Sequence, residues 1–251
     1  MPIAASQLEP GDILFKHASR GAVSQRIRKG QISHYDRTLR ETGPSPMGRD
    51  AATDITHVAM AGGPDDVMEF DEGGASKWQI VMKKGYGFVR GAMNLASRRG
   101  NRYEVFKCRD RGLAAAALDK AELIWDITHQ TGGRAVASYG LSNMLGTALF
   151  HSHGSGAGQS DYERRLDSWL RDASRAASVF RRKTNLQFYC SEFVSFCYMW
   201  AASETKEGRT LGAEFLFGTD KSRIAPVELY VRIETAGRSH FDFKGTLYTA
   251  P

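Results

Sequence analysis

Short apolar runs bounded by turn residues recur along the chain. Residues 55–61 and 67–70 are two such runs, and the sequence Gly-Gly-Pro-Asp-Asp lies between them. Apolar runs joined by a turn of this kind are typical of an antiparallel hairpin. Alternating or continuous apolar character predicts further strands within residues 9–15, 78–89, 102–108 and 241–248. The pattern therefore predicts a small antiparallel sheet.

Apolar residues at three- and four-residue spacing predict helices elsewhere. The clearest helix covers residues 113–129, and others are predicted over 142–150, 160–180 and, after a turn, 224–230. One more helix begins at Cys190, and its spacing predicts a single buried face made of Phe193, Val194, Cys197, Trp200 and Ala201. We expect an α+β fold in which the sheet packs against this helix and the helix over 113–129.

Two segments interrupt this organisation and are predicted as insertions in a single domain over residues 1–251. Residues 16–54 are polar and basic with scattered Gly and Pro, which predicts a long surface insertion with one short helix. Its histidines, His17 and His34, are expected at the surface. Residues 151–183 join a Gly/Ser-rich loop to a helix with an apolar face and a face of mixed charge.

Composition is that of an ordinary soluble protein, with 41% hydrophobic and 25% charged residues. No apolar run is long enough to span a membrane, and the N-terminus lacks a basic start followed by an apolar core. We therefore expect synthesis as a cytoplasmic protein, with any export by a route that needs no cleaved signal. Three cysteines argue against a disulfide framework, and their spacing indicates no metal site, so no metal or cofactor is expected.

The net charge of +6 indicates attraction to polyanions, such as an anionic membrane surface, a cell wall or a nucleic acid. The arginines are scattered, often beside acidic residues, and no nucleic-acid-binding motif is present. Nucleic acid is therefore not an expected partner.

Cys190 is the first candidate for chemistry, because it lies at the predicted start of a buried helix. The amides and dipole of a helix N-terminus favour negative charge and so favour a thiolate. A cysteine that attacks a carbonyl also needs a base, and His57 is the histidine centred in an apolar strand. Both residues also have a structural interpretation, as a buried core cysteine and as a half-buried sheet histidine.

The same hairpin supplies a carboxylate to orient the imidazole of His57. If the turn centres on residue 63 or 64, Glu69 lies directly or diagonally across from His57 on one face. A slip of one residue would put the two on opposite faces, and in a slightly shifted register Asp71 is the alternative.

Taken together, these motifs resemble the circularly permuted NlpC-type papain-like hydrolases, which include the lecithin:retinol acyltransferase-like group. The resemblance rests on Gly-Asp-Ile-Leu-Phe at 11–15, Thr-His-Val-Ala-Met at 56–60, Glu69, and Tyr-Cys-Ser-Glu-Phe-Val at 189–194. It covers roughly residues 9–15, 55–107 and 187–230, and excludes the two insertions. The histidine strand precedes the cysteine helix here, which is the permuted order.

The resemblance implies a cysteine-dependent hydrolase or acyltransferase in which Cys190 is the nucleophile, His57 the base and then acid, and Glu69 the orienting residue. It allows a lipid acyl ester as substrate, as in a phospholipase, or a peptide amide, as in peptidoglycan. Aromatic residues around Cys190, with Phe188 and Tyr189 as expected substrate contacts, and the basic charge favour the lipid. Other interpretations are a non-enzymatic binding module and a secreted effector on the same fold.

Overall fold

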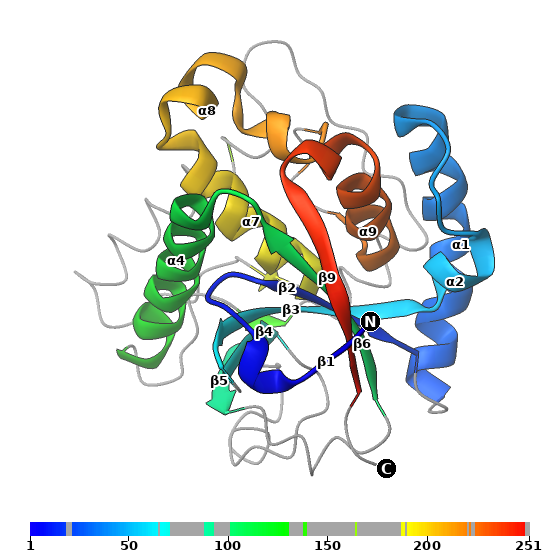
Figure 1. The fold of residues 1–251 in the computed structure, drawn as a ribbon, viewed down its shortest axis with the longest axis horizontal. Helices are drawn as coiled ribbons and strands as arrows, with labels where there is room; N and C mark the ends of the chain where they lie inside the picture. Colours follow the sequence, from blue (N-terminus) through cyan, green and yellow to red (C-terminus); the bar gives the residue numbers. More distant parts are fainter. Residues whose placement is uncertain are drawn as a thin grey trace.

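A mixed seven-stranded sheet is the largest element of the computed structural model (Figure 1). The structure describes residues 1–18, 22–64, 66–70, 88–92, 101–130, 138–139, 164, 187–188, 190–219, 221 and 224–248. In chain order the strands of the sheet are β1 (Pro2–Ile3), β2 (Ile13–His17), β3 (Ile55–Gly63), β4 (Asp66–Phe70), β5 (Phe88–Ala92), β6 (Arg102–Cys108) and β9 (Phe241–Tyr248).

The strands lie in the order β1-β9-β6-β2-β3-β4-β5. The pair β1–β9 is parallel, and every other neighbouring pair in this sheet is antiparallel. A separate parallel pair joins β7 (Ser138–Tyr139) to β8 (Gln187–Phe188). The predicted hairpin and the strands over 102–108 and 241–248 are confirmed. The alternation predicted for β6 is confirmed too, because Val105 packs in one apolar cluster and Phe106 in another.

Helices pack on the sheet and on one another to enclose the main core. They are α1 (Ala22–Thr42), α2 (Arg49–Thr53), α4 (Arg111–Gln130), α7 (Cys190–Ser203), α8 (Lys206–Leu211) and α9 (Pro226–Glu234), with short 3-10 turns η1 (Ala5–Gln7), η3 (Ala213–Leu216) and η4 (Ala236–Ser239). The core joins Phe15 of β2 and Met60 of β3 to Leu113 of α4, Phe193 of α7 and Leu229 of α9. The described part of the chain is thus a mixed α/β structure, consistent with the α+β prediction.

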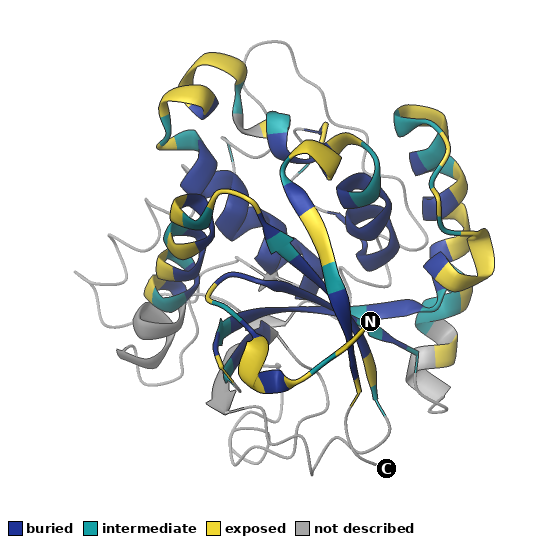
Figure 2. Ribbon diagram, viewed as in Figure 1, coloured by how far each residue is buried: buried dark blue, intermediate teal, exposed yellow. Residues whose placement is uncertain are grey.

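Helix α7 is buried on every side, whereas the sequence predicted one buried face. All residues from Cys190 to Ala202 are buried, and the ribbon of α7 is dark blue over this range in Figure 2. The reason is that α7 contacts β3 and β4 of the sheet, α4 and α9 beside it, and α8 with η3 at its far end. By contrast, α4 shows the two-sided pattern that its sequence predicts, with Ala117 and Ala121 buried and Leu123 exposed.

Residues 16–54, expected as a surface insertion with one short helix, instead contain a long helix and several buried side chains. Residues 16 and 17 complete β2, and α1 is a 21-residue helix that packs against α9. Among the residues of α1 whose burial the structure describes, the buried positions follow helical spacing, but three of the four are polar: Gln31, His34, Tyr35 and Thr38. A search for apolar periodicity does not detect a polar stripe. His17 and His34, expected at the surface, are both buried.

The strand expected over 78–89 is described only from residue 88, as part of β5. Residues 142–150 lie outside the described residues, as do 151–183 except for Arg164. No helix in the described ranges is both long enough and apolar enough to cross a membrane.

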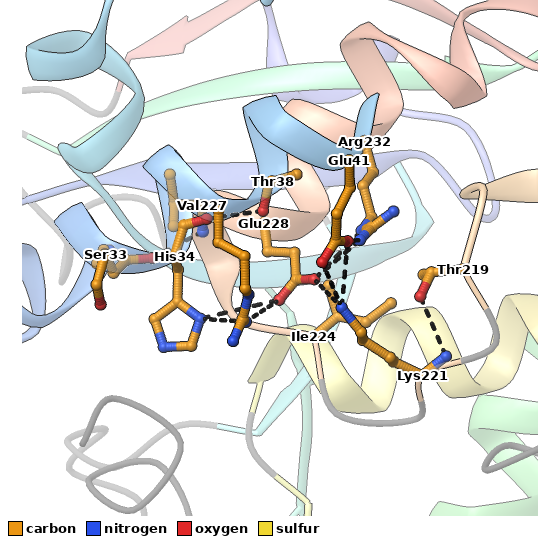
Figure 3. Close-up of polar contacts among 12 residues, drawn as sticks. Ser33, His34, Thr38, Glu41, Thr219, Lys221, Ile224, Val227, Glu228 and Arg232 are labelled. Atoms are coloured by element: carbon orange, nitrogen blue, oxygen red, sulfur yellow. Dashed lines mark hydrogen bonds and ion pairs between the residues drawn. The ribbon is translucent and has the colours of Figure 1, made fainter. Parts of the chain in front are cut away.

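A buried ion-pair network joins α1 to α9 (Figure 3). The carboxylate of Glu228, on α9, is fully buried and lies 3.2 Å from Arg232, 3.4 Å from Arg37 and 3.8 Å from Lys221. The guanidinium of Arg232 also donates to Glu41 of α1 and to the carbonyls of Phe217 and Gly218. Buried charges without such partners are strongly destabilising, so the network is a condition for docking α1.

Replacing Arg232 by Met should lower the free energy of unfolding by about 3–5 kcal/mol, because it leaves the Glu228 carboxylate buried without its nearest partner. The double variant Glu228→Gln/Arg232→Met should lose less than the single variant. Urea unfolding measures both.

The matched control is Arg109→Met, which removes a bidentate arginine–carboxylate pair with Asp242 that is more than half exposed. It should change stability far less. Equal losses in Arg232→Met and Arg109→Met would contradict the assigned role of the buried network.

Candidate active site

Cys190 is the first residue of α7, as the sequence predicted, and is 2% exposed. The next residue anchors this helix start, because the Ser191 hydroxyl donates a 2.6 Å hydrogen bond to the carbonyl of Ile224. The first backbone N–H groups of a helix have no partner within the helix. The amide of Cys190 and the amides that follow it therefore place a positive electrostatic potential beside the thiol.

His57 reaches this helix start from β3, next to an irregularity in the strand pairing. Lys16 of β2 pairs with His57 and the next residue, His17, pairs with Ile55, so Thr56 is an extra residue opposite β2. Such β-bulges redirect neighbouring side chains and are frequent beside active sites. The bulge lets Ile55 and Val58 both pack in the main core, although three positions separate them. It therefore breaks the alternation of β3 immediately before His57.

Glu69 approaches His57 from the neighbouring strand. Met60 pairs with Met68 and Ala61 with Val67, which places Glu69 diagonally across from His57, one of the two arrangements expected. Its Oε2 lies 2.9 Å from Nε2 of His57, and the Glu69 side chain is 6% exposed. Asp71, the alternative, lies outside the described residues.

Two groups act on the imidazole of His57. Its Nε2 is paired with the Glu69 carboxylate, and its side chain also interacts with Cys190. The structure thus brings together Cys190, His57 and Glu69, which lie far apart in the sequence.

Opposing effects act on the pKa of His57. Burial alone would lower it, but the negative charge of Cys190 and the hydrogen bonds to Cys190 and Glu69, together with the Glu69 charge, raise the pKa of His57 to about 10. The imidazole is therefore protonated at neutral pH, and its positive charge lies beside Cys190. The other two cysteines differ, because burial raises the pKa of Cys108 to about 11 and that of Cys197 well above the ordinary value.

The aromatic residues around Cys190 divide into two groups. Tyr189 and the side chain of Phe188 lie outside the described residues, and the backbone of Phe188 belongs to β8. Phe193 and Phe196 are fully buried members of the main core. These two therefore give no support to a lipid substrate, since their rings pack within the protein.

A second buried polar group near the site was missed by the sequence prediction. His17 lies between the carboxylates of Asp54, at 3.2 Å, and Glu104, at 3.0 Å. Glu104 also accepts a 2.6 Å hydrogen bond from Tyr230 of α9. The signal was present in the alternation of Ile13, Phe15 and His17, which places the histidine on the core side of β2.

Within the described ranges, no cluster of three or more His, Cys, Asp or Glu residues is arranged to hold a metal ion. No protein-family model, curated protein or solved structure matches the chain. Functional inference therefore rests on the geometry of Cys190, His57 and Glu69.

We expect a thiol-directed alkylator to label Cys190 rapidly near neutral pH, which is below the ordinary thiol pKa of about 8.5. An ordinary thiol is only a few per cent ionised near pH 7, so His57→Ala should slow labelling there by roughly 30-fold. The protonated state of His57 also contributes stability below its unfolded pKa of about 6.5, and this contribution is lost as the pH rises through about 10. Labelling quenched at timed intervals and followed by peptide mapping measures the rate at Cys190. Unfolding measured as a function of pH tests the stability contribution of His57.

Glu69→Gln is the intermediate variant, since it removes one of the charges that raise the pKa of His57. The stability contributed by protonated His57 should be lost at lower pH in this variant than in the parent. Uniformly slow labelling of Cys190 in parent and variants would identify a structural cysteine and reject the ion pair. Cys108 and Cys197 serve as internal controls that should remain unlabelled at neutral pH.

Proposed function

We propose that the protein is a cysteine-dependent acyl hydrolase or acyltransferase. The observation that carries the proposal is the imidazole of His57, which is hydrogen-bonded to the Glu69 carboxylate and interacts with the Cys190 side chain. A nucleophile within reach of a base, with the base oriented by a third group, is the arrangement that acyl transfer requires. The position of Cys190 at a helix start adds independent support.

The proposed reaction begins with attack of the Cys190 thiolate on an acyl carbonyl carbon. The carbonyl oxygen takes the negative charge, and the Cys190 backbone N–H helps to stabilise it. The protonated His57 then gives its proton to the leaving alcohol or amine, and the bond to that group breaks to leave a thioester. Water or an acceptor alcohol or amine loses a proton to His57, attacks the thioester and releases the thiolate.

Glu69 has two tasks in this scheme. Its contact with Nε2 fixes the tautomer and orientation of the imidazole. Its charge also stabilises the imidazolium that faces the thiolate in the resting state. The same pairing would keep His57 cationic until the leaving group accepts the proton.

Chain order supports a relationship to the permuted NlpC-type papain-like hydrolases. The histidine strand β3 comes first, the strand β4 with its carboxylate follows, and the cysteine helix α7 comes last. The resemblance of the motifs around residues 11–15, 56–60 and 189–194 points in the same direction. We propose the permuted papain-like fold on these two grounds.

For the substrate we propose a lipid acyl ester. The net charge of +6 would attract the protein to an anionic membrane surface, where such esters are concentrated. The rival substrate is a peptide amide such as those of peptidoglycan. The two share the chemistry at Cys190 and differ in the leaving group, an alcohol or an amine.

Cys190→Ala should abolish turnover, a loss of at least about 10³-fold, while leaving the unfolding transition nearly unchanged. The assay compares vesicles with and without anionic phospholipid against purified peptidoglycan. Acyl release from anionic vesicles supports the lipid assignment, and release from peptidoglycan alone replaces it with an amidase.

Cys197→Ala is the matched control, because it removes a second buried cysteine from the same helix without touching His57. It should retain activity after allowance for any loss of stability. Retained turnover in Cys190→Ala would reject the proposed nucleophile, and no turnover by the parent on either substrate would favour a binding module.

A further inference from the structure

One buried amide side chain joins the strand of His57 to helix α9. Gln31, on α1, is 3% exposed. Its Nε2 donates a hydrogen bond to the carbonyl of Ile55, two positions before His57 on β3. Its Oε1 accepts a 2.7 Å hydrogen bond from the backbone N–H of Val227 in the first turn of α9.

The contact with Val227 replaces a missing helix cap. Helix α9 begins with Pro226, and its N-cap residue Ala225 makes no side-chain hydrogen bond to the helix. The free N–H groups at a helix start need an acceptor when they are buried. The Gln31 oxygen provides one, so α9 depends on a residue of α1 to begin where it does.

The segment before α9 continues this connection to the nucleophile. Ile224, two positions before Pro226, accepts the 2.6 Å hydrogen bond from the hydroxyl of Ser191. Ser191 is fully buried and follows Cys190 directly. A continuous path of hydrogen bonds and short backbone segments therefore runs from His57 through Gln31 and Ile224 to Cys190.

A glutamine suits the centre of this path because it both donates and accepts through one planar group. Because Gln31 is buried, the loss of either hydrogen bond would leave a backbone group without a partner, at a cost in free energy. An apolar side chain of the same length would fill the space but would connect neither element.

We propose that Gln31 is a positioning residue, which sets the separation between His57 and Cys190 by tying β3 to the segment that anchors α7. The inference rests on the proposed function and adds a residue from the segment that the sequence marked as an insertion. Gln31 acts through the path from Ile55 and Val227 to Ser191, and it takes no part in proton transfer.

Gln31→Met keeps the side-chain volume and removes both hydrogen bonds. Misplacement of reacting groups by about 1 Å lowers turnover by up to about 100-fold, so we expect kcat to fall by about 10- to 100-fold with KM nearly unchanged. Cys190 alkylation, which needs no substrate, should slow at neutral pH, and its pH profile should shift toward that of His57→Ala.

Thr38→Val is the matched control on the same buried stripe of α1. The Thr38 hydroxyl is fully buried and donates to the carbonyl of His34 in its own helix, so it joins α1 to no other element. This variant should lower the melting temperature and leave the alkylation profile as in the parent. A Gln31→Met protein with lowered stability and an unchanged profile would reduce Gln31 to a structural residue and overturn the proposal.

Ser191→Ala provides a second test if Gln31→Met folds poorly. It breaks the path at its other end and should also slow alkylation. The double variant Gln31→Met/Ser191→Ala combines the two changes, and Gln31→Glu/Ser191→Ala replaces it if the first does not fold. In the double variant, alkylation should be slowed no more than in the slower of the two single variants, because both hydrogen bonds belong to one path. Slowing equal to the product of the single effects would show independent roles and overturn the inference.

The labelling rate of the parent distinguishes failure of the proposed function from failure of the positioning role alone. If Cys190 of the parent is slow to label, the ion pair and the proposed function fail together with the inference. If the parent labels rapidly and the Gln31 variants do too, the proposed function stands and the positioning role alone is rejected.

Discussion

Complete burial of α7 is the constraint on which the rest of the molecule depends. A helix with residues from Cys190 to Ala202 out of contact with water must be covered on all sides. The sheet covers one side, α4 and α9 flank it, and η3 with α8 cover its far end. Each cover brings apolar surface to the same core, and the free energy of that burial holds the layers together. At the start of α7 the Cys190 side chain meets the imidazole of His57.

Polar contacts are a large part of the interface between α1 and α9. Gln31 bonds the backbone of α9, and Arg37 and Glu41 meet the buried pair of Glu228 and Arg232, beside an apolar cluster that includes Tyr35 and Val231. The cost of removing these charges from water offsets much of the stability that their pairing provides. The interface nevertheless allows only one alignment of the two helices, because every buried charge must meet its partner. These contacts therefore fix the register of α1 against α9 more than they strengthen its attachment. A fixed register suits a helix whose Gln31 bonds the strand of His57.

Sequence reasoning succeeded where apolar residues mark the interior. Alternation in β6 and a stripe of small residues in α4 gave both elements within a few residues, and Cys190 was correctly placed at a helix start. The approach of Glu69 to His57 followed from hairpin parity, although two registers remained open until the pairing of Met60 with Met68 was known.

The sequence could not reveal elements whose interior is polar. The stripe of Gln31, His34 and Thr38 carries no apolar signal, so α1 resembled a surface loop. The extra residue Thr56 in β3 was equally hidden, because a bulge depends on the partner strand and leaves no mark in a single sequence. The burial of α7 on all sides was missed for a related reason. Its second face is covered by elements whose positions are set by tertiary structure.

The place of β9 in the sheet has a consequence for biosynthesis. This strand, residues 241–248, lies between β1 at residues 2–3 and β6 at residues 102–108. A nascent chain on the ribosome can form the β2–β3 and β2–β6 pairs early, but one edge of β6 stays unpaired until residue 248 has emerged. Exposed strand edges promote association with other chains. The edge of β6 therefore stays open to association with other chains for as long as translation of residues 109–248 takes.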